Sequence, residues 1–253
     1  MGYEKKLTHF KNAIEEDIEL LSEAIKYHGL IWKKIEPFTG GRILEIGSGR
    51  GNFACQLQKK EFFILSDYNS GFISRLREKL GNITNKEIMY LDAEDISSDE
   101  IEYLRTKRID TIICVHVIEH IYDDIICVKN LSRALNPGGK IIIIGPAYNF
   151  LFSSLDREYG HYRRYNSKSM NNLAKKTGLL ISHLSYFNFL GIFGWFFLHK
   201  LFKKKRLSHA SLIIFQTILP LARFLDALFF KSIGLSVLAV FVKTDDELLI
   251  ISK

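Results

Sequence analysis

Cysteine is scarce in this sequence, and its spacing excludes the usual cysteine-built sites. The three cysteines, Cys55, Cys114 and Cys127, show neither metal-ligand spacing nor the pattern of a disulfide framework. We expect them to be buried free thiols in a reducing cytosol. Residues 1–20 are charged and lack an apolar run, so the sequence predicts no signal peptide.

Internal repeats and low-complexity linkers are also missing. No apolar run reaches the roughly 20 uninterrupted residues of a membrane-spanning helix, so none is predicted. The composition is that of a folded globular protein: 253 residues, of which 47% are hydrophobic and 25% charged. We interpret residues 1–253 as a single domain, with an N-terminal helical region over 1–39 and a helical insertion over 188–233.

Short apolar runs alternate with helical patterns along the chain. Strands are predicted at 42–47, 62–67, 87–92, 110–117, 140–146, about 179–186 and 236–243. Helices are predicted at 7–35, 51–60, 70–80, 97–106, 121–135 and 167–177, and a hairpin over 244–253. This alternation favours an α/β fold with a doubly wound, seven-stranded, mostly parallel sheet, and an apolar, basic helical insertion before the last strand.

The first predicted strand runs into EIGSGRG, residues 45–51. Its glycines permit a sharp turn and let a ligand touch the backbone, as at a nucleotide-type site. The spacing is G-x-G-x-G and not the dinucleotide fingerprint G-x-G-x-x-G. Glu45 at the entrance suits a cationic ligand better than a pyrophosphate. Asp67 ends the second strand, where a carboxylate can take ribose hydroxyls, and Asp92 ends the third.

As a set, these residues resemble the class I S-adenosylmethionine-dependent methyltransferases, which have a Rossmann-like fold. The wording NPGGK before the fifth strand is also similar to that family. The resemblance covers roughly residues 40–186 and the last strand. It implies S-adenosyl-L-methionine as the cofactor, with the glycine loop around the methionine part, Asp67 on the ribose and Asp92 near the adenine. By position, the implied cofactor-binding residues are Glu45, Gly47, Gly49, Gly51, Asp67, Tyr68, Asp92, Ala93 and Val115.

His116, Glu119 and His120 spell H-x-x-E-H, which is also a zinc-protease motif. That motif needs a helix, whereas His116 lies in a predicted strand. The segment also resembles a metal-holding E-x-x-E-H segment of some methyltransferases, but His116 departs from that pattern. We therefore expect no metal, and assign these residues to structural hydrogen bonds and to the wall of the acceptor pocket.

The polar loop DREYGHYRRY, residues 156–165, follows the fifth strand at the carboxyl edge of the sheet, where open α/β folds bind ligands. An alcohol acceptor must lose a proton, and His161 is the candidate base. Arg163 and Arg164 would grip an acceptor carboxylate or phosphate. Tyr159, Tyr162 and Tyr165 would offer flat faces and hydroxyls to a sugar or ring. In the alternative interpretation, Asp156 or Glu158 pairs with an arginine and the loop only braces the sheet.

The net charge of +7 is concentrated in the insertion over 188–233, which carries seven lysines and arginines against one aspartate. The insertion also holds nine of the nineteen phenylalanines, together with Trp195. One hypothesis places it in the surface of an anionic membrane, with aromatics at acyl-chain depth. The alternatives are a helical cap on the sheet and a homodimer contact.

We therefore predict an S-adenosylmethionine-dependent O-methyltransferase acting on a sugar or lipid-linked glycan. It would be cytoplasmic, or peripheral at the inner face of the membrane. The GHYRRY wording resembles a methyltransferase subgroup linked with surface glycan or glycolipid synthesis. The alternatives are a non-catalytic, membrane-associated nucleotide-binding module and a methyltransferase for another small molecule or nucleic acid. Nucleic acid is disfavoured, since no RNA-binding module and no N-P-P-[YFW] signature is present.

Overall fold

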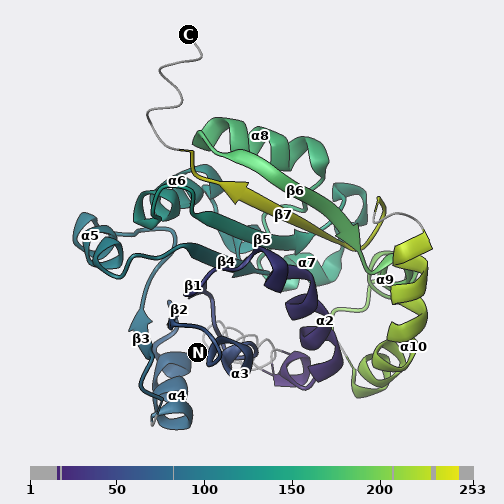
Figure 1. Ribbon diagram of the computed structural model, residues 1–253. Coiled ribbons are helices and arrows are strands. Elements are labelled where there is room, and N and C mark those ends of the chain that lie inside the picture. The colour runs from purple at the N-terminus through teal and green to yellow at the C-terminus, as the bar shows by residue number, and fades with distance from the viewer. Residues whose placement is uncertain (1–15, 18, 82, 207, 229–231, 245–253) are drawn as a thin grey trace, which may run out of the picture.

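In the computed structural model, which describes residues 16–17, 19–81, 83–206, 208–228 and 232–244, seven strands form one sheet (Figure 1). The strands are β1 (Arg42–Ile46), β2 (Phe62–Asp67), β3 (Lys86–Tyr90), β4 (Thr111–Val115), β5 (Lys140–Pro146), β6 (Leu180–Phe187) and β7 (Ser236–Val242). Their order is β3-β2-β1-β4-β5-β7-β6. Strands β1 to β5 pair in parallel, and β7 is antiparallel to β5 and β6. The predicted fold class is confirmed.

Helices cover both faces of the sheet. The α-helices are α2 (Ile25–Ile35), α3 (Ala54–Leu57), α4 (Ser70–Leu80), α5 (Ser98–Thr106), α6 (Asp124–Ala134), α7 (Ser154–Glu158), α8 (Ser167–Thr177), α9 (Phe189–Trp195) and α10 (His209–Leu228). Shorter turns are η1 (Glu36–Phe38), η2 (Ile118–His120) and η3 (Asn149–Leu151), and η4 (Phe196–Leu201) is a π-helix.

The isoleucine run of β5 shows why the sheet is a middle layer. Side chains alternate between the faces of a strand. Ile141 and Ile143 pack in the cluster that includes α5, α6 and α8, whereas Ile142 and Ile144 pack in the cluster that includes α2, α3 and α4. A parallel strand buried on both faces has no position for a polar side chain, which accounts for the unbroken apolar run.

Several predicted helices differ from those observed. The helix predicted over 51–60 is shorter than expected and consists of α3 alone, because the turns of the glycine loop extend as far as Phe53. The described part of the helix predicted over 7–35 is interrupted by a turn, and α2 begins only at Ile25. The helix predicted over 121–135 begins at Asp124, because the Asp123 side chain caps it by accepting from the Ile126 N–H at 2.9 Å. The hairpin predicted over 244–253 lies outside the described residues except for position 244.

The cysteine expectation is right for two of three residues. Cys114 and Cys127 are buried free thiols, in β4 and α6. Cys55 is exposed, contrary to the expectation. The single turn of α3 buries Ala54 and Leu57 against the sheet, so the position between them faces solvent.

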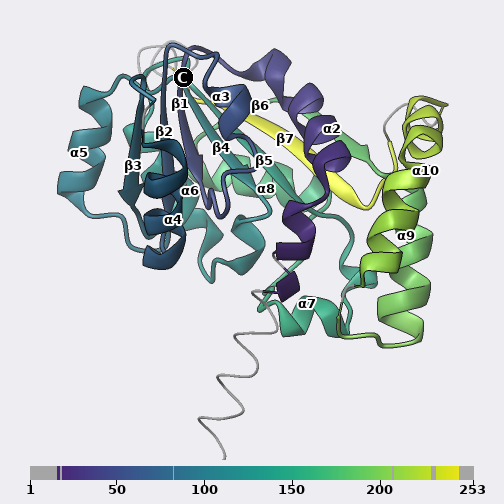
Figure 2. The same cartoon turned by 90° about the horizontal axis from the view of Figure 1, so that it is seen from below.

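The insertion before the last strand forms a helical hairpin of α9, η4 and α10, residues 189–228, here called the α9–α10 hairpin. Figures 1 and 2 show it beyond the end of β6, with α10 near α2. The buried Asp226 carboxylate anchors it by accepting from the backbone N–H groups of Asn188 at 2.9 Å and Phe189 at 2.8 Å. Although no spanning helix was predicted, α10 is long and apolar enough to cross a membrane by length and composition alone.

Replacing Asp226 with alanine should destabilise the protein by about 3 kcal/mol or more. Two backbone donors at the start of α9 would lose a charged acceptor and stay buried. Urea unfolding measures the effect, with Arg223→Ala as the control at an exposed position of the same helix. If the two variants have equal free energies of unfolding, Asp226 is not the anchor.

Candidate active site

The loop between β1 and α3 is shaped by glycines that no other residue could replace without strain. Gly47, Gly49 and Gly51 have φ values of 69°, 50° and 74°. A Cβ at Gly47 would lie 2.6 Å from a methyl group of Val117, and one at Gly51 would lie 2.8 Å from Leu76. The loop therefore leaves its backbone open to a ligand and approaches the segment after β4 closely.

Asp67 joins this loop to the end of β2. Its carboxylate accepts from the Gly49 N–H at 2.9 Å and from the Asn69 N–H at 2.8 Å. Burial raises the pKa of Asp67, and hydrogen bonds from backbone N–H groups oppose that shift. Each carboxylate oxygen keeps a second lone pair for a ligand hydroxyl. The residue predicted to hold ribose therefore also supports the glycine loop.

Glu45 is buried in β1, and its Oε2 atom has no hydrogen-bond partner among the described residues. Burial raises its pKa to about 8. A buried carboxyl without a partner is costly when ionised, and a nearby cation would relieve that cost. The predicted cofactor carries a sulfonium and an ammonium group, so a buried carboxyl at this position fits it.

The remaining predicted cofactor residues lie along the same edge of the sheet. Tyr68 follows β2 and is 70% exposed. Asp92 is half-buried and Ala93 buried, directly after β3, and Val115 ends β4. Their place at the carboxyl ends of three neighbouring strands agrees with the sequence prediction. Direct contact with a cofactor stays a prediction for each.

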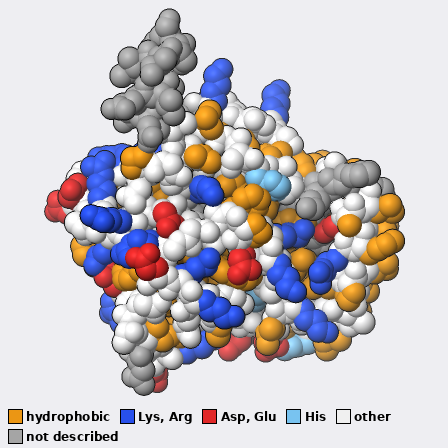
Figure 3. All heavy atoms as spheres, viewed as in Figure 1, with side chains coloured by type: hydrophobic (Ala, Val, Ile, Leu, Met, Phe, Trp, Pro, Cys, Tyr) orange, Lys and Arg blue, Asp and Glu red, His pale blue; other side chains and the backbone are white. Residues whose placement is uncertain are grey.

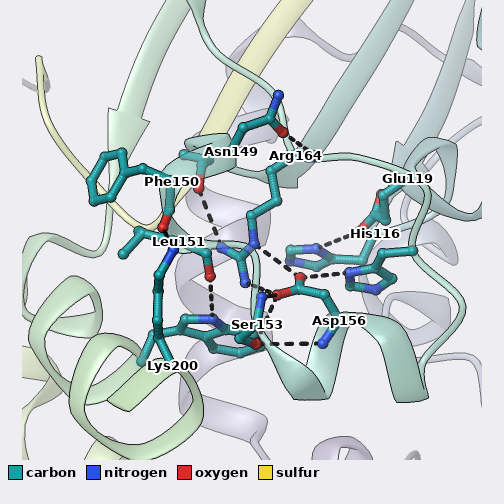
Figure 4. Close-up of polar contacts among 12 residues, drawn as sticks. His116, Glu119, Asn149, Phe150, Leu151, Ser153, Asp156, Arg164 and Lys200 are labelled. Carbon is teal, nitrogen blue, oxygen red and sulfur yellow. Dashed lines mark hydrogen bonds and ion pairs between the residues drawn. The ribbon is translucent and has the colours of Figure 1, made fainter. Parts of the chain in front are cut away.

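Four side chains from two segments meet beyond β4 and β5. Glu119 is fully buried, and its Oε1 atom lies 3.2 Å from His116 Nδ1 (Figure 4). The rings of His120 and His161 pack edge to face at 4.5 Å. Burial pushes the pKa of Glu119 up, but the hydrogen bond from His116 and the charges of the three histidines outweigh it, so the pKa is lowered. The expected structural hydrogen bonds of this segment are confirmed.

His28 of α2 is a neighbour of this cluster that the sequence did not reveal. Burial, with a contribution from His116, lowers the pKa of His28 to about 4. Its only sequence signal was a histidine among the apolar positions of an N-terminal helix, and that pattern is common in helices without a site.

Glu119, His120 and His161 each offer one atom that could bind a metal ion, and these atoms lie within 4.8 Å of one another, which is close enough to consider a metal ion. Oε2 of Glu119 has no partner among the described residues.

The buried Asp156 carboxylate organises the polar loop (Figure 4). It lies 2.9 Å from His161 Nδ1 and accepts from Arg164 Nε at 2.9 Å and Nη2 at 3.0 Å. Ser153 donates to it from its backbone N–H at 2.7 Å and its hydroxyl at 2.8 Å. Burial raises the pKa of Asp156, but His161 and Arg164 outweigh it and leave the pKa low. The ionised carboxylate therefore accepts from His161 Nδ1–H, which leaves Nε2 as a proton acceptor.

Two residues predicted to bind the acceptor serve the loop itself. Arg164 is buried, and its guanidinium is occupied by Asp156 and by the Ala147 carbonyl at 3.2 Å. Tyr165 is also buried, and its hydroxyl donates to Asp124 at 2.9 Å. The expectation that Arg164 grips an acceptor anion and that Tyr165 offers it a free face is therefore wrong. For Arg164 the alternative interpretation holds, because this arginine pairs with Asp156 and braces the loop.

The other three loop residues are placed differently. Tyr159 donates its hydroxyl to Asp17 at 2.9 Å, which ties the loop to the segment before α2. Arg163 pairs with Asp124 at 3.0 Å but remains partly exposed. Tyr162 is 53% exposed, and its ring packs against Tyr122 and the Arg163 guanidinium. Of the predicted acceptor-binding residues, Tyr162 is the one most open to a ligand in this structure.

Glu45→Gln tests the buried carboxyl of β1. Because the folded pKa of about 8 lies above the usual glutamate value of 4.5, the stability linked to Glu45 is present below about pH 4.5. It is lost as the pH rises to about 8, since the unfolded chain releases this proton first. The gain in free energy of unfolding caused by Glu45→Gln should therefore be larger at about pH 8 than at about pH 5 in urea melts. Glu78→Gln, at an exposed site, is the control. A gain that does not change with pH would contradict the assignment.

Comparison with known proteins gives the family. A family described as "Methyltransferase domain" matches residues 13–184, which is more than half of the chain. A search of the curated proteins gave no match. Among solved structures, the CurJ carbon methyltransferase has a TM-score of 0.54 at 16% identity, over 88% of this chain and 54% of that one. Phosphoethanolamine N-methyltransferase 2 of Haemonchus contortus, in complex with S-adenosyl-L-methionine, has a TM-score of 0.57 at 20% identity, over 87% and 53%.

The chain thus spans about half the length of these two proteins. The N-methyltransferase NodS of Bradyrhizobium japonicum, in complex with S-adenosyl-L-homocysteine, matches with a TM-score of 0.53 at 14% identity, over 87% of each chain. Similarities at such low identity show a shared fold only. Membership of a family is shown by the match over residues 13–184. The chain belongs to the methyltransferase-domain family, that of the class I S-adenosylmethionine-dependent methyltransferases.

Proposed function

We propose that the protein is an O-methyltransferase that acts on a hydroxyl of a sugar or lipid-linked glycan in the cytoplasm. The observation that carries this proposal is the pair of His161 and Asp156 at the carboxyl edge of the sheet. Asp156 holds Nδ1–H of the imidazole at 2.9 Å, so Nε2 can take a proton from an alcohol. Amines and carbanions have other proton requirements, whereas a neutral hydroxyl needs such a base.

Methyl transfer mainly requires alignment of the acceptor with the departing sulfur. S-adenosylmethionine, when bound, supplies an electrophilic methyl group on a sulfonium. Glu45 would compensate positive charge, and the glycine loop and Asp67 would hold the methionine and ribose parts. The side chains of Glu119, His120 and His161 would line the acceptor side. Of the three, Glu119 is buried, His161 is half-buried and His120 is exposed, so an acceptor hydroxyl would reach the imidazole of His161 from the open side of this cluster.

The sugar assignment rests on aromatic rings at the rim of this cluster. Tyr162 and Tyr122 are 53% and 72% exposed, and their rings pack edge to face at 5.4 Å. The backbone N–H of Tyr162 donates to the Glu119 carbonyl at 2.8 Å, which fixes the ring beside the cluster. Flat aromatic faces with hydroxyls suit the apolar face of a sugar ring.

A second candidate function is methyl transfer to nitrogen. Two of the similar structures are titled N-methyltransferases. The same histidine could take a proton from an ammonium acceptor. In the loop, Asp156 is occupied by Arg164 and Glu158 by Lys205, but Oε2 of the neighbouring Glu119 has no partner among the described residues and could face such an acceptor. A third, a non-catalytic nucleotide-binding module, conflicts with an intact cofactor edge. Calorimetry with S-adenosylmethionine and then with NAD tests this candidate. Binding of neither compound would favour the non-catalytic module over the methyltransferase.

His161→Ala should lower turnover by about 10²–10⁴-fold, because the acceptor proton would lose its base. Cofactor affinity should stay nearly unchanged. The assay uses radiolabelled S-adenosylmethionine with a panel of nucleotide sugars and lipid-linked glycans, and His209→Ala, at a 77% exposed side chain, is the control. A normal rate at saturating acceptor would remove His161 from the mechanism. A raised KM at normal kcat would make it a binding residue.

Asp67→Ala should weaken S-adenosylmethionine binding by roughly 2–4 kcal/mol, because two hydrogen bonds to a charged group are lost. Since Asp67 also supports Gly49, a small loss of thermal stability should accompany the change. Calorimetry and thermal unfolding measure the two effects separately. Asp95→Ala, at an exposed acid beyond β3, should change neither. Unchanged affinity in a folded Asp67 variant would exclude the ribose contact.

A further inference from the structure

The helix α10 has two apolar faces, and the part of the chain that the structure describes covers one of them. Leu219, Ala222 and Asp226 are buried against the rest of the molecule. The outer side carries large exposed apolar residues: Ile213, Ile214, Ile218, Leu221, Phe224 and Leu228. The surface helix of a globular protein normally presents polar residues there. Something other than water is expected on the outer face.

The preceding helical segment extends this surface. Its exposed large apolar residues are Phe193, Phe196, Phe197, Leu201 and Phe202. Together with those of α10 they form what is here called the hairpin surface. Figure 3 shows hydrophobic side chains along the α10 side of the molecule, with lysine and arginine side chains grouped next to them. An apolar surface of this extent marks an interaction site.

Cations without an acidic partner among the described residues border the hairpin surface. Lys203, Lys204 and Arg223 are exposed and make no ion pair with a described residue, whereas Lys205 and Arg206 are paired with acids. A groove of about 280 Å³ runs between α2 and α10. Its lining is Lys26, Gly29, Leu30, Lys33, Leu219, Pro220 and Arg223. Three cations and no acid thus surround an apolar floor.

We infer that the α9–α10 hairpin lies on an anionic membrane surface, with the groove of Lys26, Lys33 and Arg223 receiving the phosphate of a lipid headgroup. Apolar side chains at acyl depth and cations at headgroup depth are the two features of an interfacial helix. This inference does not rest on the proposed acceptor.

A second copy of the chain is a poorer occupant. A two-fold interface places the same patch on both partners. The cations bordering the hairpin surface would then be brought close to the cations of the partner's patch, and like charges across an interface repel. An anionic headgroup layer instead meets the same cations with opposite charge.

A spanning arrangement of α10 also fits the structure less well. The inner face is held by the Asp226 carboxylate on Asn188 and Phe189. Arg223 and Asp226 would lie within the hydrocarbon if α10 crossed the bilayer, at a considerable cost. A helix that packs on its own protein along one side and exposes apolar residues along the other lies in the plane of the interface.

The hairpin also contacts the polar loop and the residues just before it. Trp195 Nε1 donates to the Leu151 carbonyl at 3.1 Å, and the Arg164 guanidinium stacks 4.4 Å from the Trp195 ring. The Ser154 hydroxyl donates to the His199 carbonyl at 3.1 Å. Membrane contact at the hairpin would therefore fix the position of the loop that carries His161.

Co-sedimentation with vesicles tests the inference, using phosphatidylcholine vesicles with and without phosphatidylglycerol. Wild type should pellet with the anionic vesicles and be released by high salt and by alkaline carbonate. Ile218→Glu/Phe224→Glu, on the outer face, and Lys26→Gln/Lys33→Gln/Arg223→Gln, in the groove, should each lower partitioning by about tenfold or more. Lys168→Gln/Lys175→Gln/Lys176→Gln removes equal charge from α8 and should lower it much less.

Four results would overturn the inference. Wild type could stay in the supernatant with anionic vesicles at low salt, or resist carbonate as a spanning protein would. The α8 control could lose as much binding as the groove variant, which would mean unspecific attraction. Sedimentation equilibrium without lipid could show a dimer that Ile218→Glu/Phe224→Glu splits, with vesicle binding unchanged. Calorimetry with S-adenosylmethionine on the same samples separates these results from a failure of the proposed function.

Discussion

The buried carboxylate of Asp156 is the interaction on which the polar side of the site depends. A charge in the interior is tolerated only when several donors replace its water, because desolvation costs more than a single bond returns. Asp156 has these donors in Arg164, His161 and Ser153. Removing any of them would leave charge uncompensated. The loop therefore has one arrangement in which all of these contacts are satisfied.

That arrangement connects three parts of the fold. Arg164 reaches back from the loop to the Ala147 carbonyl after β5. On its other side the same guanidinium stacks on Trp195 of the α9–α10 hairpin. Tyr159 joins the loop to Asp17 before α2. The sheet, the hairpin and the N-terminal segment thus all position the imidazole of His161, although none of them provides it.

The sequence predicted the sheet because its inner strands, β1, β2, β4, β5 and β7, are buried on both faces, and such strands appear as unbroken apolar runs between turns. The edge strands β3 and β6 are only partly buried. It also placed Glu45 and Asp67 at strand ends, since the carboxyl ends of parallel strands meet at one edge. It could not separate Arg163 from Arg164. Adjacent residues point in different directions, and only the fold decides that Arg164 faces Asp156 while Arg163 faces the surface. His28 was missed for a related reason, because contacts between distant segments leave no local pattern.

The two ends of the site hold buried carboxyls in opposite electrostatic states. Glu45 has a carboxyl oxygen without a hydrogen-bond partner among the described residues, and burial raises its pKa to about 8. Asp156 is surrounded by hydrogen-bond donors, among them the Arg164 guanidinium, and its pKa is lowered. Environments that push the pKa values of acids apart assign them different tasks. The uncompensated acid lies where a cationic cofactor would restore balance, so cofactor binding and ionisation of Glu45 should favour each other. The compensated acid already has its full set of partners, and it can therefore orient His161 whether or not a cofactor is bound.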